Sequence, residues 1–367
     1  MNETPPAIVR AVNRSWVVEN PDNVNTANYE YAKLPIGLQG VEEALDRLGY
    51  YKRLTETWYD TWKPILQRMQ LEVKGISNPN TAVNEGGEII LSPPICRILK
   101  SAADGGVLLQ RIPKNLEEDL RDQVLPLIAP FFEKQPGSFP TIEYFVRLND
   151  CSPKDGIGGQ GPFAEPWSVL VSLCTSSRTQ KALRDILECG IYNNGDDDDK
   201  TPTTSRNHKH NTHEVLHMIP WREEMSTLNE FRIFVPPNGN VRAISQYSER
   251  SGGWADDPEH DYAKIKSLVP QMIGCNTKFR ALVHEAGLEL PKGGYVLDVH
   301  VQRNANSTSP QGFEWLVEPI EINPFGAQLA SGSGIFQWLT DWECMYGFSD
   351  NIVVALVYDD CREDKGE

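Results

Sequence analysis

The chain has 367 residues, of which 40% are hydrophobic and 23% charged, a composition typical of a globular protein with two domains or two lobes. Its 35 Lys and Arg residues are outnumbered by 51 Asp and Glu residues, so the formal net charge is −16. This charge argues against nucleic acid as the main partner, because binding a phosphate backbone needs a basic face. A single nucleotide needs only a few local cations and is not excluded.

Targeting signals and disulfides are not expected. No apolar run approaches the length of a membrane-spanning helix, so no membrane partner is predicted. The first residues, MNETPPAIVRAVNRSW, contain no basic segment followed by an apolar one, so no secretory signal is expected. The 7 cysteines are scattered and form no CxxC pair, which favours free buried thiols and a cytoplasmic location.

Residues 1–138 are predicted to form an N-terminal arm and a helical region. Residues 1–40 are rich in Pro and Asn and are expected to be an extended arm. Beyond them, apolar residues recur at helical spacing, with a break expected at Gly49. The aromatic residues Trp58 and Trp62 in this region could form a ligand-binding box, but their helical spacing favours a place in the core.

Residues 139–213 are predicted to form the first of two lobes. A strand is expected in TIEYFVRLND, which alternates and carries β-branched and aromatic residues. A glycine-rich loop follows, with the sequence SPKDGIGGQGPF, and then an apolar and helical stretch. Residues 193–213 are polar, acidic and rich in histidine, which predicts a loop or a disordered insertion.

Histidines in and just after this insertion could form a metal site. Their spacing matches no rigid metal motif, and most of them lie in the low-complexity segment, so solvated side chains are favoured. These histidines are His208, His210, His213 and His217.

Residues 214–367 are predicted to form a second lobe made mostly of antiparallel strands. A hairpin is expected in NEFRIFVPPNGNVRAISQYS, because Asn-Gly is a strong turn signal. After a helical segment, a second hairpin is expected in GGYVLDVHVQ and EWLVEPIEINPFG, and a short helix or loop in GIFQWLTDWECMYG. The order hairpin, helix, hairpin predicts an α+β fold.

The second hairpin holds side chains that suit Mg²⁺. Glu321 and Asn323 are two residues apart in a strand and share one face, and Asp298 lies in the middle of the neighbouring strand. Two carboxylates and an amide oxygen are ligands that suit Mg²⁺ bound to a triphosphate. The alternative is that each acid pairs with an arginine.

Cations near this hairpin could contact phosphate. Arg232 in EFRIFV could neutralise phosphate charge or grip a carboxylate, and the alternative is a structural pair with Glu230. Lys154, in the glycine-rich loop, could reach the phosphates if that loop acts as a lid. A hydrolase based on Ser331 or Ser333 is disfavoured, because no GxSxG motif and no His/Asp arrangement accompanies them.

The order of several segments resembles the cell division cycle protein 123 family. These segments are YFVRLNDCSPKDG, SLCTSS, NEFRIFVPPNGNVRAISQ, YVLDVHVQ and EWLVEPIEINPFG. The resemblance extends over about residues 139–347. It implies an ATP-grasp-like α+β fold, in which two α+β lobes with mostly antiparallel sheets enclose a nucleotide cleft that holds ATP and Mg²⁺.

The resemblance also implies which residues form the site. The metal ligands it implies are Asp298, Glu321 and Asn323. The further nucleotide-binding residues it implies are Arg147, Lys154, His217, Met218, Ile219 and Arg232. Three of the chain's departures from the family pattern fall among the implied site residues and the lid. Arg147 stands where the family has a lysine, His217-Met218-Ile219 where its adenine hinge has Arg-Lys-Trp, and the lid segment carries extra glycines.

The resemblance leaves three functions open. The first is an ATP-dependent ligase, in which an acyl phosphate forms from a small-molecule or peptide carboxylate and is displaced by an amine, with Arg232 and Lys154 as catalytic residues. The second, the role implied by the family, is an assembly chaperone for the γ subunit of translation initiation factor 2. The third is a degenerate domain without activity. The ligase is the primary expectation, because the changed hinge and lid suit a separate small substrate.

Overall fold

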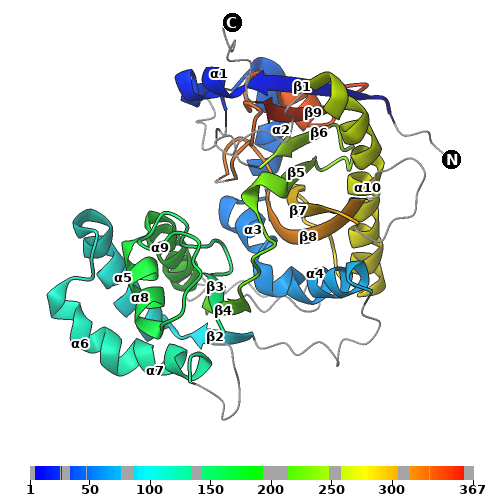
Figure 1. Cartoon of the computed structure of the whole chain (residues 1–367). Coiled ribbons are helices and arrows are strands. Elements are labelled where there is room, and N and C mark those ends of the chain that lie inside the picture. Colours follow the sequence, from blue (N-terminus) through cyan, green and yellow to red (C-terminus); the bar gives the residue numbers. More distant parts are fainter. Residues whose placement is uncertain are drawn as a thin grey trace, which may run out of the picture. The chain divides into compact units, whose positions relative to one another are not determined.

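The computed structural model describes most of the chain, in several stretches. These stretches are 5–24, 26, 34–46, 48–75, 86–133, 142–192, 214–247, 258–304, 315–329 and 331–358. The chain divides into two compact units: unit 1 is Met1–Ala82 with Glu223–Glu367, and unit 2 is Val83–Arg222. Figure 1 labels the elements of both.

The unit boundaries differ from the segments 1–138, 139–213 and 214–367 expected from the sequence. Strand β2 (Gly87–Leu91) and strand β3 (Tyr144–Arg147) both pair antiparallel with β4 (Glu214–Pro220). Backbone hydrogen bonds therefore join parts of all three expected segments in unit 2. The helical region before residue 76 belongs instead to unit 1, with the last strands of the chain.

Unit 1 is built on a six-stranded sheet with the order β1-β9-β6-β5-β7-β8. The strands are β1 (Ala7–Asn13), β5 (Glu230–Val235), β6 (Ala243–Gln246), β7 (Tyr295–Arg303), β8 (Trp315–Pro324) and β9 (Ile352–Tyr358). The pairs β5–β6, β5–β7 and β7–β8 are antiparallel, and β9 is parallel to both of its neighbours. Both predicted hairpins are confirmed, and the fold is α+β with mostly antiparallel pairing.

The hairpin β5–β6 turns where the Asn-Gly signal predicted. Gly239 has a φ of +74°, a conformation that is strained for residues with a side chain. The side chain of Asn238 accepts a hydrogen bond of 2.9 Å from the backbone of Asn240. The side chain of Asn238 thus holds the turn locally.

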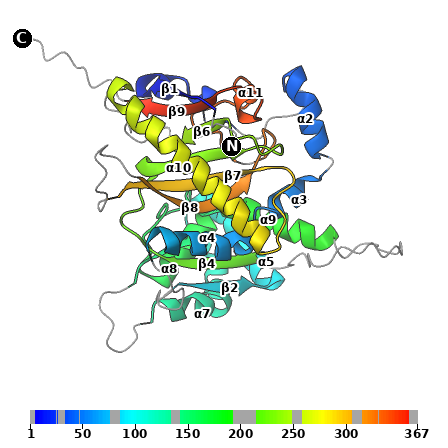
Figure 2. The ribbon, with the colours of Figure 1, turned by 90° about the vertical axis from the view of Figure 1, so that its right-hand side faces the viewer.

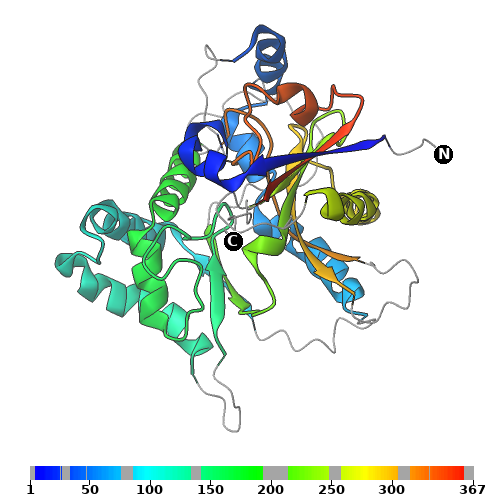
Figure 3. The same cartoon turned by 45° about the horizontal axis from the view of Figure 1, so that its top comes forward.

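Two strands of this sheet were not predicted. Residues 1–40 were expected to form an extended arm, but β1 lies at the edge of the sheet, paired along its whole length with β9, and helix α1 (Arg14–Glu19) follows it (Figure 3). Strand β9, near the end of the chain, lies between β1 and β6. Parallel pairs join segments distant in sequence, so no turn signal marks them.

Helices cover one face of the sheet. Helix α10 (Pro258–Glu285) crosses this face diagonally in Figure 2, and α4 (Tyr59–Val73) packs beside it against β8. The ring of Trp62 lies 5.6 Å from that of Phe279, and Phe279 lies 5.6 Å from Tyr295 of β7. Trp62 is 2% exposed, so its predicted place in the core is confirmed.

A Trp62→Ala variant should lower the free energy of unfolding by about 3–5 kcal/mol, because it leaves a large cavity between α4 and α10. The indole also donates a hydrogen bond of 2.8 Å to the carbonyl of Glu56, which the variant loses. Urea unfolding measures the effect. Trp58→Ala is the matched control. Because Trp58 is only half-buried, this variant should lower the free energy of unfolding clearly less. Equal losses in the two variants would contradict this account of the core.

The other face of the sheet carries a second core. Phe234 of β5 and Val296 of β7 pack with Phe325, Trp338 and Tyr346, which come from the chain after β8. The remaining helices of unit 1 are α2 (Ile36–Asp46), α3 (Tyr50–Thr55) and α11 (Trp342–Met345). The expected break at Gly49 is confirmed, because this residue, with a φ of +83°, separates α2 from α3.

Unit 2 packs helices against the three-stranded sheet β2-β4-β3. Its long helices are α5 (Pro93–Leu109), α8 (Pro166–Thr175) and α9 (Ser177–Tyr192). Short helical turns span Lys114–Leu116, α6 (Glu117–Asp119), Leu120–Val124, α7 (Leu125–Ile128) and Ala129–Phe131. Its core includes Leu99, Val124, Leu170, Leu183 and Leu216, each at most 1% exposed.

Several expectations fall partly or wholly outside the described residues. The insertion 193–213 lies outside them, with His208, His210 and His213. Within the part of the chain that the structure describes, no helix is long and apolar enough to cross a membrane. Five cysteines in that part are free and buried, as predicted: Cys96, Cys151, Cys174, Cys275 and Cys344.

Candidate functional site

Three adjacent strands of unit 1 bring the predicted metal ligands together. In the register of the sheet, Asp298 of β7 lies opposite both Arg232 of β5 and Glu321 of β8. Asn323 is two residues beyond Glu321 and lies opposite Val296. The four polar residues therefore share one face of the sheet, which follows from the period of two in a β-strand.

The side-chain amide of Asn323 forms hydrogen bonds with the carboxylates of both Asp298 and Glu321. The side-chain nitrogen of Asn323 donates to Oδ2 of Asp298 over 2.9 Å and to Oε1 of Glu321 over 3.3 Å. Asp298 is 1% exposed, whereas Glu321 and Asn323 are half-buried. A buried carboxylate needs a positively polarised partner, and here the amide of Asn323 is one such partner.

Arg232 is the second partner of Asp298. Its Nη2 lies 3.1 Å from Oδ2 of Asp298, its Nη1 donates to the carbonyl of Gly332 over 2.6 Å, and its guanidinium lies 4.6 Å from the ring centre of Tyr247. Burial lowers the pKa of Arg232, but the charge of Asp298 raises it more. The pKa therefore lies above its usual value, and Arg232 stays charged at neutral pH.

Two further polar residues on this face were missed in the sequence. His300 of β7 lies opposite Glu318 of β8, and they are 1% and 0% exposed. The same period of two that joins Asp298 to its neighbours could have identified His300. Glu318 could not be found in this way, because the register shifts by one residue beyond Asp298 and Ile320 is the extra residue.

The loop after β8 is tied to this face. Arg232 donates to the carbonyl of Gly332, and the hydroxyl of Ser245 accepts a hydrogen bond of 2.7 Å from the backbone of Ile335. Gly334, at a φ of +63°, has no room for a Cβ, which would lie 2.3 Å from the same hydroxyl. The loop is therefore fixed beside the candidate site.

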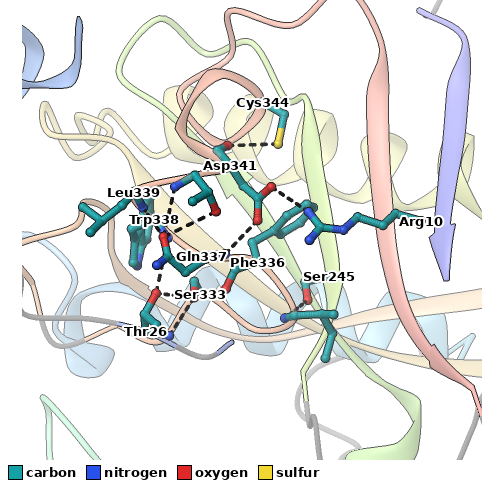
Figure 4. Close-up of polar contacts among 12 residues, drawn as sticks. Arg10, Thr26, Ser245, Ser333, Phe336, Gln337, Trp338, Leu339, Asp341 and Cys344 are labelled. Atoms are coloured by element: carbon teal, nitrogen blue, oxygen red, sulfur yellow. Dashed lines mark hydrogen bonds and ion pairs between the residues drawn. The ribbon is translucent and has the colours of Figure 1, made fainter. Parts of the chain in front are cut away.

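The N-terminal segment holds the far side of this loop (Figure 4). The backbone of Thr26 donates to the hydroxyl of Ser333 over 2.8 Å, and Arg10 forms an ion pair of 2.6 Å with Asp341. The hydroxyl of Ser333 in turn donates to the carbonyl of Phe336. These bonds give Ser333 a structural role, and it remains disfavoured as a hydrolase nucleophile.

The other predicted nucleotide-binding residues belong to unit 2. Arg147 of β3 lies opposite His217 of β4, and Ile219 lies opposite Phe145. Met218 is 1% exposed and packs in the core of this unit. His217 and Met218 were expected in an adenine hinge, but they pair with strands on both sides, so the sheet engages their backbone groups.

Polar side chains of unit 2 gather where β3 and β4 lie side by side. Arg147 is 3% exposed and donates from Nε to the carbonyl of Leu148 over 3.1 Å. Nε2 of His217 lies 2.9 Å from Oδ1 of Asn149, whose backbone nitrogen donates to Glu214 over 2.7 Å. Buried polar groups in such a network fix one another in place.

The glycine-rich segment that contains Lys154 is fixed at Asp155. The carboxylate of Asp155 accepts hydrogen bonds from the hydroxyl of Ser176 and from the backbone of Ser177, at 2.5 and 2.9 Å. The backbone of Ile157 donates to the hydroxyl of Thr175 over 2.8 Å. The segment is therefore held against the junction of α8 and α9.

An Asp155→Asn variant should lose on the order of 1 kcal/mol of stability at pH 7, because charge-assisted hydrogen bonds to α9 are lost. Burial raises the pKa of Asp155, but the hydrogen bonds from Ser176 and Ser177 outweigh it and hold the pKa below its usual 3.8. The stabilisation is therefore present above that pH and is lost as the pH falls through the folded-state pKa.

Urea unfolding of both proteins between neutral and acidic pH tests this sign. The difference in the free energy of unfolding should shrink as the pH falls below the usual 3.8 of the carboxyl. A difference that grows in acid would overturn the role of Asp155.

Similarity to known proteins was found only among solved structures. No protein-family model matches the chain, and no curated protein matches it. Among solved structures it is similar to Cdc123 from Schizosaccharomyces pombe, with 15% identity and a TM-score of 0.46, over 83% of this chain and 96% of that chain. It is also similar to a C-terminally truncated Cdc123 from the same organism, with 14% identity, a TM-score of 0.45 and the same coverage. This is the family that the sequence motifs resemble.

Proposed function

We propose that the protein binds ATP with Mg²⁺ on the polar face of β5, β7 and β8. The observation that carries this proposal is the gathering of Asp298, Glu321 and Asn323 around one amide group, beside Arg232. Two carboxylates and an amide oxygen suit Mg²⁺, which also takes oxygens from phosphates. The buried cation Arg232 adds the charge that a triphosphate needs.

The donor set fits a cation. Among the residues that the structure describes, no three His, Cys, Asp or Glu side chains gather in a metal-binding group. Mg²⁺ is usually bound by one or two carboxylates together with phosphate oxygens, and Asp298 and Glu321 are two such carboxylates. Asn323 would be a further ligand, because its amide already contacts both of them. A half-turn of the amide would replace its nitrogen by its oxygen, and the cation would then supply the positive charge between the acids.

Each group has a separate task in this proposal. When bound, Mg²⁺ would polarise and neutralise phosphate oxygens. Asp298 and Glu321 would hold the cation, and Asp298 would also keep the guanidinium of Arg232 on the same face. Arg232 would neutralise phosphate charge from the same strand face.

We propose that the protein, with its nucleotide bound, acts as an assembly factor. Its partner would be the γ subunit of translation initiation factor 2. The motif order supports this role, because it resembles a family of such chaperones. The changed hinge and lid sequences had favoured a specialised ligase. In the structure the residues of that hinge lie within β4, and the glycine-rich segment is held at Asp155.

A ligase is the second candidate. The observation that favours it is Arg232, a buried cation held 3.1 Å from Asp298, where charge on a transferring phosphoryl group could be stabilised. The substrates would then be a small-molecule or peptide carboxylate and an amine.

Calorimetry with ATP tests nucleotide binding, in Mg²⁺ and in a chelator. Binding should require Mg²⁺ and should be lost in Glu321→Gln, which changes a half-buried side chain with little risk to the fold. Equal affinity with and without Mg²⁺ would contradict the proposal. Capture of the purified γ subunit in the presence of ATP, without phosphate release, supports the assembly role. Phosphate release stimulated by one member of a panel of carboxylates and amines would support the ligase.

A further inference from the structure

The turn after strand β8 is held by a buried ion pair from another part of the chain. The chain leaves β8 at Pro324, directly after Asn323, and passes through Phe325 and Gly326. The turn therefore adjoins the end of β8, which carries Glu321 and Asn323 and which pairing with β7 also holds.

Arg53 of α3 and Glu42 of α2 contact both sides of the turn. Nη2 of Arg53 donates to the carbonyl of Phe325 over 2.7 Å, and Oε1 of Glu42 accepts from the backbone of Ala327 over 3.3 Å. Both side chains are almost fully buried, at 3% and 0% exposed. Hydrogen bonds therefore hold the turn at the carbonyl of Phe325 and at the N–H group of Ala327.

The two residues also contact each other and a tyrosine. Nη1 of Arg53 lies 3.7 Å from Oε2 of Glu42, and the hydroxyl of Tyr346 donates to Oε1 of Glu42. Burial raises the pKa of Tyr346 well above its usual value, and the charge of Glu42 raises it further. The phenol therefore stays protonated and remains a donor to Glu42.

Gly326 allows the turn to lie directly against this pair. Its φ is +129°, and a Cβ there would lie 2.4 Å from Nη2 of Arg53 and 3.1 Å from Oε1 of Glu42. No side chain fits between the turn and the ion pair, so a shift of either one would move the other.

Stability alone is a poor explanation for such a pair. Two charges lose their hydration on burial, and replacing a buried ion pair with apolar residues of similar volume is often neutral or even stabilising. Residues behind metal ligands, by contrast, orient those ligands, and their loss typically weakens metal binding by about 10–100-fold.

We propose that Glu42 and Arg53 are positioning residues, which hold the end of β8 so that Glu321 and Asn323 face Asp298. This inference rests on the proposed Mg²⁺ site. It also gives the helices before residue 76 a function, since α2 and α3 would take part in metal binding without contacting the metal.

The test is the affinity for Mn²⁺ in the presence of ATP, followed by electron paramagnetic resonance. The main variant is Glu42→Leu/Arg53→Met, which removes the charges but keeps apolar volume. Its melting temperature should stay within a few degrees of wild type, while its Mn²⁺ affinity should fall by about 10–100-fold. Tyr346→Phe removes one hydroxyl only and should cause a smaller loss of affinity in a folded protein, even if the double variant does not fold.

Val357→Ala is the matched control, since Val357 of β9 is buried in the same core as Tyr346 but lies outside α2, α3 and β8. It should lower the melting temperature and leave Mn²⁺ affinity unchanged. Wild-type Mn²⁺ affinity in the folded double variant, or in Tyr346→Phe if the double variant fails to fold, would overturn this inference alone. A wild-type protein that binds no Mn²⁺ with ATP would overturn the proposed function itself.

Discussion

An Asp298→Ala variant should lose Mg²⁺-dependent ATP binding and about 3–5 kcal/mol of the free energy of unfolding. Asp298 is 1% exposed and pairs with Arg232, which is 7% exposed, so the variant leaves a buried cation without this carboxylate. It also removes one of the two carboxylates that share the amide of Asn323. ATP calorimetry and urea unfolding measure the two losses.

The double variant Asp298→Leu/Arg232→Met separates the two effects. Because it replaces the ion pair by apolar side chains, it should recover most of the stability but none of the Mg²⁺-dependent binding. A single variant that is as stable as wild type and binds Mg²⁺ with ATP equally well would contradict the roles given to both residues.

An Arg232→Lys variant should weaken ATP binding by about 10–100-fold, the cost of a charge-assisted hydrogen bond to a phosphate oxygen. Lysine keeps the positive charge, but it cannot contact Asp298 and the carbonyl of Gly332 while also binding phosphate. For an assembly factor, affinity for the γ subunit in the presence of ATP should fall in parallel.

Single-turnover phosphate release distinguishes this outcome from the ligase. If Arg232 acts mainly on a transition state, its loss should slow the chemical step by about 10²–10³ while ATP affinity changes little. That result would contradict the assembly role and favour the ligase.

Local signals in the sequence predicted much of the candidate site. The two-residue spacing of Glu321 and Asn323 depends only on the geometry of a strand, and the Asn-Gly turn marked the hairpin that carries Arg232. The convergence of Asp298 with Glu321 and Asn323 then followed from the prediction that their two strands form a hairpin. Each of these features depends on residues close together in the chain.

Features that depend on distant contacts could not be predicted in this way. The extra residue Ile320 brings Glu318 to the same face as Glu321, although their spacing of three suggests opposite faces. Arg53 reaches the carbonyl of Phe325 across 272 residues, and no local pattern indicates that contact. The parallel pairing of β1 with β9 also joins residues that are far apart in the sequence. Residues 7–13 were therefore expected to be part of an extended arm.

The expected adenine hinge shows a similar limit. The pairing of β4 with β2 depends on residues 87–91, which are distant in the sequence. A resemblance that begins near residue 139 contains no information about that strand. The resemblance therefore placed His217 and Met218 at a hinge, but it did not show that both pair with strands on each side.

Anomalous diffraction at the manganese edge, from crystals grown with Mn²⁺ and ATP, tests the central claim most directly. The account predicts a manganese peak between the carboxylates of Asp298 and Glu321, with the amide of Asn323 turned to present its oxygen and phosphate oxygens completing the coordination. ATP bound at a different place, with no manganese at these carboxylates and Asn323 still donating to both, would contradict it.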